Sequence, residues 1–266
     1  SREAWDERAI GWARELEEDE SRKRRSERRV AETVKFLRSR GLLMENDEVI
    51  DIGCGPGRFV TEFARYAKHV TGTDISANMC RFGLEFANSS KVFNVDFVPC
   101  DFKEADIEEM GWEKRFDLVF SSITPAMSTY ESFRKAEKMS RAFCFQSNFV
   151  KMSDPVGEQI LEEVLDEDGL VPERSIQSLL PLFNILCLEG VHPEVTFFRE
   201  TDTEILRPGK ELALRLLKHT AVKDPSEELI ERINKAASRF ADEDGNIRRS
   251  TEWIYSWILG DVRERR

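Results

Sequence analysis

The chain has 266 residues, of which 40% are hydrophobic and 34% charged, and this composition is typical of a folded, water-soluble protein. It contains no uninterrupted run of 18 apolar residues, and its N-terminus is acidic where a secretory signal would be basic and then apolar. A formal net charge of −11 disfavours partners with a phosphate backbone, because such partners are bound by clustered Lys and Arg.

These features predict a cytoplasmic protein, monomer or homodimer, with no nucleic-acid and no membrane partner. The five cysteines are odd in number and include no Cys-x-x-Cys pair, which argues against disulfides and structural zinc, so we expect no metal. The one basic cluster, residues 22–29, follows an acidic run and is interpreted as a solvated helix face.

Residues 1–40 are expected to form an N-terminal helical segment. Trp5, Ala9, Trp12 and Leu16 recur at helical spacing, a second helical pattern runs from Val30 to Leu37, and a glycine then ends it.

Residues 41–150 alternate between short β-rich runs and helical patterns, which is typical of a parallel sheet with helices on both faces. The fourth run is almost continuously apolar, as in a central strand buried on both faces. The expected strands of this part are 48–51, 69–74, 95–100, 116–121 and 142–147.

Beyond residue 150 the pattern changes, and two helical insertions are expected, 151–189 and 202–246. The first would act as a cap. Between and after them, residues 190–201 and 247–260 are assigned to C-terminal strands of the same sheet.

The most informative motif lies between the first strand and its helix. In Asp51-Ile52-Gly53-Cys54-Gly55-Pro56-Gly57 the glycines alternate, so that bare backbone can approach a ligand closely. A dinucleotide-binding loop would instead place its third glycine at position 58, where this chain has Arg58. Alternatively, the glycines make only a tight turn.

Two further acids favour a nucleoside ligand. Asp74 ends the second strand, where a carboxylate can accept hydrogen bonds from both ribose hydroxyls. Asp101 follows the third strand and would reach the same edge of the sheet, where it could accept a hydrogen bond from an adenine amino group. Ile75, Met79 and Phe102 could enclose the ring.

These motifs resemble the class I S-adenosylmethionine (SAM)-dependent methyltransferases over about residues 45–150, including Phe116–Ser121, which is similar to the family's fourth-strand motif. The resemblance implies that Asp101 and Phe102 hold the adenine, Asp74 the ribose and the Ser121 backbone the amino group. It implies that the methionine part of SAM meets Asp51, Gly53, Cys54, Gly55 and Gly57.

The resemblance also implies a Rossmann-like α/β fold: a three-layer, doubly wound, mostly parallel seven-stranded sheet with an antiparallel last strand, plus N-terminal helices and helical insertions. SAM would be the methyl donor and S-adenosylhomocysteine (SAH) the product.

The acceptor is expected to be a small molecule or a metabolic intermediate. The Asn-Pro-Pro-aromatic signature of many amino-group methyltransferases is absent, and residues 122–125 stand in its place. No catalytic residue is assigned, because a sulfonium is already activated and transfer depends mainly on proximity and orientation. Thr124 and Asn148 are substrate candidates, while Trp5, Arg8 and Trp12 share a helical face and form a lid or merely pack on the sheet.

Two alternatives remain open from the sequence. One is a SAM-binding regulatory protein without turnover, and the other is a nicotinamide-dependent oxidoreductase.

Overall fold

The computed structural model describes residues 3, 5–7, 11, 20–165, 179–218, 220–222 and 224–264. Of the expected N-terminal helical segment, the described part contains the helix α2 (Glu20–Arg38), and Arg8 and Trp12 lie outside the described residues. No helix in the described part of the chain is long and apolar enough to cross a membrane.

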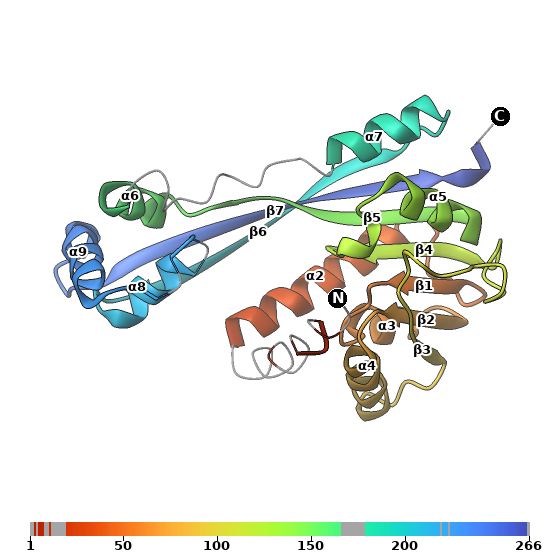
Figure 1. The fold of residues 1–266 in the computed structure, drawn as a ribbon, viewed down its shortest axis with the longest axis horizontal. Helices are drawn as coiled ribbons and strands as arrows, with labels where there is room; N and C mark the ends of the chain where they lie inside the picture. The colour runs from red at the N-terminus through yellow and green to blue at the C-terminus, as the bar shows by residue number, and fades with distance from the viewer. Residues whose placement is uncertain are drawn as a thin grey trace. The chain divides into compact units, whose positions relative to one another are not determined.

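A seven-stranded sheet of order β3-β2-β1-β4-β5-β7-β6 organises the chain (Figure 1), and the expected α/β fold class is confirmed. The pairs β1/β2, β2/β3, β1/β4 and β4/β5 are parallel, whereas β7 runs against its neighbours. The strands are β1 (Glu48–Ile52), β2 (His69–Asp74), β3 (Val95–Pro99), β4 (Phe116–Ser122), β5 (Ser140–Ser153), β6 (Glu194–Leu206) and β7 (Ile247–Asp261).

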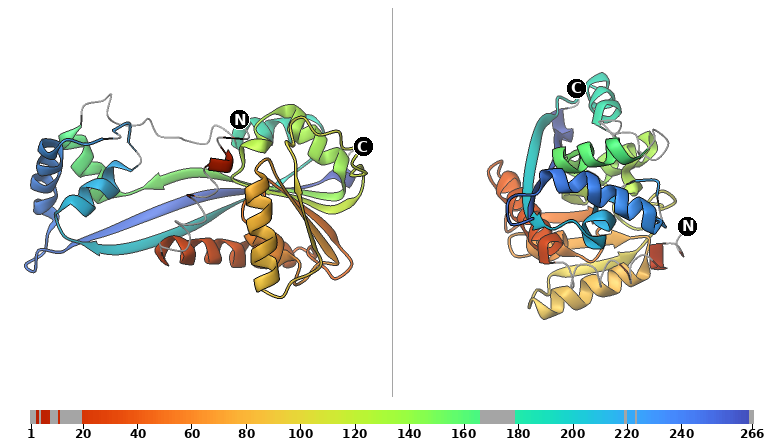
Figure 2. Two further views of the ribbon diagram at one scale, coloured as in Figure 1. Left: turned by 60° about the horizontal axis from the view of Figure 1, so that its bottom comes forward. Right: turned by 90° about the vertical axis from the view of Figure 1, so that its left-hand side faces the viewer.

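Helices cover both faces of the parallel strands because consecutive residues of a strand point in opposite directions. Phe120 of β4 contacts Phe59 and Phe63, with ring centroids 4.8 Å apart in both pairs, whereas its neighbour Val119 belongs to the core cluster that includes Phe133. Phe59 and Phe63 belong to α3 (Arg58–Phe63), and Phe133 belongs to α5 (Tyr130–Met139). These two helices therefore lie on opposite faces, which gives the three layers. The helix α4 (Ala77–Ser89) packs on β2 and β3, as the left view of Figure 2 shows.

Contacts divide the chain into two compact units. Unit 1 comprises Ser1–Asn148, Ser178–Thr196 and Ser256–Arg266, and it contains β1 to β4, the helices named above and α7 (Leu179–Leu188). Unit 2 comprises Phe149–Gln177 and Phe197–Tyr255.

Unit 2 has its own apolar core, formed by three helices around residues such as Ile160, Leu212 and Ile233, all of which are buried. Its helices are α6 (Pro155–Val164), α8 (Lys210–Leu217) and α9 (Glu227–Ala237). The remaining short elements are the 3-10 turns η1 (Pro125–Met127), η3 (Ser238–Phe240) and η4 (Val262–Glu264).

Three strands are longer than the sequence pattern predicts. β5, β6 and β7 were expected over 142–147, 190–201 and 247–260, but they span 140–153, 194–206 and 247–261. The first residues of both expected insertions are therefore strand. In β6 the extension covers residues 202–206 and begins with the polar run Asp202 to Glu204. This run has no apolar alternation, so pairing with the neighbouring strand determines its conformation instead.

Candidate functional site

A pocket of about 210 Å³ lies at the carboxyl ends of the parallel strands of unit 1. In open α/β sheets this edge is where ligands bind. The lining residues come from the N-terminal segment, from the end of β2, from the first turn of α4 and from the segments that follow β1 to β4. They are Trp5, Gly53, Gly55, Thr73, Asp74, Ile75, Met79, Cys100, Asp101, Phe102, Lys103, Ile123, Thr124, Pro125 and Ala126.

The glycine loop presents bare backbone to this pocket. Gly53 and Gly55 have φ of +71° and +53°, a region that side chains rarely adopt, and a Cβ on Gly53 would collide with Thr124. The amides of Gly53 and Cys54 both donate to the carbonyl of Thr73, at 2.7 and 2.9 Å, which ties the loop to the end of β2. The loop is therefore fixed where a ligand can meet its backbone.

Gly57 does not line the pocket and has a packing role. It caps the amino end of α3 with φ of +72°, and a Cβ there would lie 2.6 Å from Phe97 and 2.9 Å from the Cα of Gly83. The third glycine therefore allows α3, α4 and β3 to approach one another closely.

We expect Gly57→Ala to lower the free energy of unfolding by about 2 kcal/mol. The alanine would have to adopt a strained left-handed backbone conformation, and its Cβ would overpack the contact with Phe97 and Gly83. Gly55→Ala is the matched control, because its Cβ would meet open space and only the strain remains. Urea titration of both variants measures the difference, and equal losses would contradict the packing role of Gly57.

Asp74 lies half-buried at the end of β2 and organises the loops on either side. Its Oδ2 accepts from the Gly55 amide at 3.0 Å, and its Oδ1 accepts from the Ser76 amide at 2.9 Å. Burial raises the pKa of this carboxyl, and the two amides oppose the rise. Each carboxylate oxygen accepts more than one hydrogen bond, so Asp74 can still receive hydroxyl donors from the pocket.

Asp101 begins a turn after β3. Its carbonyl accepts from the amides of Glu104 and Ala105 at 3.1 and 3.0 Å, and its Oδ1 accepts from the Lys103 amide at 3.2 Å. Phe102 is buried in the core cluster of unit 1 while it lines the pocket. The carboxylate of Asp101 and the ring of Phe102 therefore both line the pocket, and one short turn positions them.

Of the three lid candidates, Trp5 lines the pocket. The neighbouring Asp6 accepts from the Ser76 hydroxyl at 2.5 Å and from the Asn78 amide at 3.5 Å, so the N-terminal segment is attached to the start of α4.

Asp51 is 1% exposed and does not line the pocket, and its Oδ2 has no hydrogen-bond partner among the residues that the structure describes. Burial, with a smaller contribution from the charge of Asp74, raises the pKa of Asp51 well above its ordinary value. The folded chain therefore retains this proton to higher pH than the unfolded chain does.

The sign of the pH dependence follows from linkage. Because the pKa of Asp51 is higher in the folded chain than in the unfolded chain, the free energy of unfolding falls as the pH rises from the ordinary Asp range through the folded-state pKa. Asp51→Asn should remove this contribution to the pH dependence of the unfolding free energy. It should also stabilise the ligand-free chain at pH 7 by about 1–2 kcal/mol. Denaturation at pH 5 and pH 8 tests this, with the exposed Glu85→Gln as control. An unchanged slope in the Asp51 variant would refute it.

Cys54 is buried and also lies outside the pocket lining. Its thiol hydrogen-bonds with Cys80, and a Cβ on Gly72 would lie 3.0 Å from its Sγ. Burial raises the pKa of Cys54, so the thiol is held in its neutral form as a packing group.

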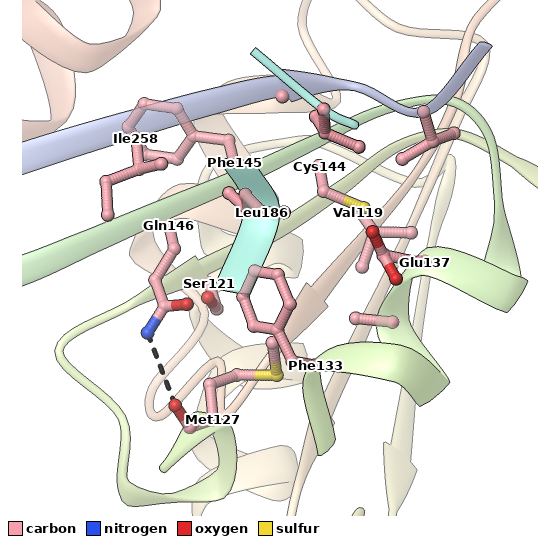
Figure 3. Close-up of a pocket in the computed structure, with 14 residues that line it drawn as sticks. Val119, Ser121, Met127, Phe133, Glu137, Cys144, Phe145, Gln146, Leu186 and Ile258 are labelled. Carbon is pink, nitrogen blue, oxygen red and sulfur yellow. Dashed lines mark hydrogen bonds between the residues drawn. The ribbon is translucent and has the colours of Figure 1, made fainter. Parts of the chain in front are cut away.

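Ser121 and Asn148 are not among the residues that line the pocket. Ser121 lines a second cavity, together with Gln146 and Met127 (Figure 3), and Gln146 donates from Nε2 to the Met127 carbonyl at 3.3 Å and to Asn148 Oδ1 at 3.0 Å. This cavity has about 10 Å³ of free volume, which is room for about one water molecule. It is too small for a cofactor or an acceptor.

Some lining residues escaped the sequence-based prediction: Thr73, Cys100, Lys103, Ile123 and Ala126. Thr73, Cys100, Lys103 and Ile123 directly adjoin predicted residues, so the rule that ligands lie beyond strand ends could have found these four. The left-handed turn at Ile123, where φ is +51°, is not indicated by its residue type. Among the described residues, no cluster of three or more His, Cys, Asp or Glu could hold a metal ion.

The chain is similar in sequence to curated RNA-modifying enzymes. It is 31% identical over 75 residues to the 23S rRNA (uracil(1939)-C(5))-methyltransferase RlmD of Francisella tularensis subsp. novicida, a match that covers 28% of this chain and 16% of the relative. The chain thus aligns with only about a sixth of the length of that curated relative.

This similarity overturns the expectation of no nucleic-acid partner. That expectation rested on the net charge, which averages over the whole surface and does not describe a local face. The basic residues 22–29 in α2 show how unevenly the charge is distributed.

Solved structures share the fold. A protein of Bacillus halodurans C-125 that is assigned as a methyltransferase has a TM-score of 0.56 at 15% identity, covering 88% of this chain and 98% of its own. The YcgJ protein of Bacillus subtilis has a TM-score of 0.53 at 14% identity, covering 87% and 97%.

A family model described as a methyltransferase domain matches residues 43–185, which is more than half of the chain and includes the glycine loop and the loops after β2, β3 and β4. The chain therefore belongs to the methyltransferase-domain family, in line with the predicted resemblance to the class I, SAM-dependent methyltransferases.

Proposed function

We propose that the pocket at the carboxyl ends of β1 to β4 binds SAM and that the chain transfers its methyl group to a small-molecule acceptor. The observation that supports this best is the convergence of Gly53, Gly55, Asp74, Asp101 and Phe102 on one pocket.

The residues present fit this cofactor. Bare backbone at Gly53 and Gly55 leaves room for close approach, and a Cβ on Gly53 would fill that space. The carboxylate of Asp74 suits a ribose diol, and the turn at Asp101 and Phe102 offers an acceptor and an aromatic ring to the adenine. The Oδ2 atom of Asp51, which has no partner in the described part of the chain, lies two residues before Gly53, and there it would stabilise a positively charged amino group of the ligand.

When bound, SAM supplies a methyl group already activated on a sulfonium. The protein's own residues then hold the donor, orient the acceptor and exclude water. On the acceptor side, we assign orientation to the η1 turn, where Thr124 caps the turn by accepting from the Ala126 amide and Ile123 and Pro125 add apolar surface.

A second candidate acceptor is an RNA base. The observation that favours it is the similarity to the 23S rRNA methyltransferases. Since the matched segment is 75 residues long, it supports shared donor chemistry more strongly than a shared acceptor.

The deciding experiment supplies the protein with methyl-labelled SAM and a cell extract separated into small molecules, RNA and protein. We expect label in the small-molecule fraction, resistant to ribonuclease and absent with Asp74→Ala. If the label is found in the RNA fraction and ribonuclease releases it, the acceptor is an RNA base and not a small molecule. SAM binding without transfer to any fraction would favour a regulatory protein.

A further inference from the structure

Lys135 makes an unusual set of contacts beside the cofactor pocket. Its ammonium donates to three main-chain carbonyls, those of Phe102 at 2.9 Å, Lys103 at 2.8 Å and Ala105 at 2.8 Å. A lysine has three donors, so this one directs all of them to a single loop. Lys135 does not line the pocket itself.

The loop that Lys135 holds is the one that presents Asp101 and Phe102 to the pocket. The turn is closed on one side by the hydrogen bonds to the Asp101 carbonyl and carboxylate. On its other side three carbonyl oxygens converge, an arrangement that is repulsive unless a donor or cation satisfies it. The Lys135 ammonium provides this, and it also lies 5.4 Å from the centroid of the Phe102 ring.

We propose that Lys135 is a positioning residue for cofactor binding, which fixes the main chain of residues 102–105 so that Asp101 and Phe102 are already placed for the adenine. This inference rests on the proposed binding of SAM in the same pocket. A loop that is ordered before binding loses less conformational freedom when the ligand arrives, and affinity rises accordingly.

Lys135→Met tests the role because it retains length and apolar volume while it removes the three donors. Lys138→Met is the matched control, an exposed lysine on the same helix whose side chain makes none of these contacts. Calorimetry at a temperature well below the unfolding midpoint measures the Kd of SAH and of 5′-methylthioadenosine, which contains the adenosine but no amino acid.

We expect Lys135→Met to raise both Kd values by the same factor, about tenfold, with wild-type values for Lys138→Met. A purely structural role would lower the Tm and leave both Kd values unchanged, which would overturn the proposal. Loss of SAH affinity without loss of 5′-methylthioadenosine affinity would also overturn it, because the effect would then lie at the amino-acid end. If the wild-type chain binds neither ligand, the proposed function itself fails.

Discussion

Replacing Asp74 by Ala should weaken SAH binding about 100-fold. A hydrogen bond to a charged group contributes about 1.5–3 kcal/mol, and the carboxylate is proposed to accept two from the ribose, so that about 3 kcal/mol or more is lost. The substitution also frees the Gly55 and Ser76 amides that the carboxylate now holds. Calorimetric titration with SAH measures the change.

Two controls separate recognition from folding. Asp74→Asn retains the shape and one acceptor oxygen, and we expect an intermediate loss. Asp96→Ala removes an exposed carboxylate from the other end of the neighbouring β3, where it contacts His69 at 2.9 Å, and SAH affinity should not change. A wild-type Kd for Asp74→Ala would show that the ribose is held elsewhere.

Replacing Arg249 by Leu should destabilise unit 2 by about 3 kcal/mol, because removal of one partner leaves a buried charge without compensation. Arg249 of β7 donates to Asp154 at 2.5 Å and to Glu204 at 2.7 Å, and both Arg249 and Asp154 are buried. Asp154 also caps α6 by accepting from the Gly157 amide at 3.1 Å, so the charge cannot move into solvent without loss of the cap.

Hydrogen exchange by mass spectrometry resolves this effect by region. Peptides of α6 and α9 should lose about 100-fold in protection, while β1 and β4 in unit 1 should not change. Arg248→Leu, at the adjacent exposed position, should leave every peptide at its wild-type protection. Unaltered protection of α6 in Arg249→Leu would refute a stabilising role for the network.

The central strands and the ligand edge could be predicted from the sequence because their determinants are local. A buried parallel strand is apolar throughout, as Phe116 to Phe120 is apart from one residue, and the glycine loop must follow such a strand directly. Asp74 and Asp101 were found by the same rule, since parallel strands bring their carboxyl ends to one edge.

Other features depend on contacts distant in sequence. The three carbonyls that Lys135 holds lie 30 to 33 residues before it, and no pattern near Lys135 indicates them. The side chain of Ser121 faces the small second cavity, because strand alternation directs it away from the pocket that the following loop lines. The polar extension of β6 likewise depends on its partner strand.

A crystal structure of the chain grown with SAH tests the proposed cofactor site most directly. We expect one SAH molecule per chain, with its ribose hydroxyls within hydrogen-bond distance of the Asp74 carboxylate and its adenine between Ile75 and Phe102. Density for SAH elsewhere, or an empty pocket at a concentration that saturates binding in solution, would contradict it.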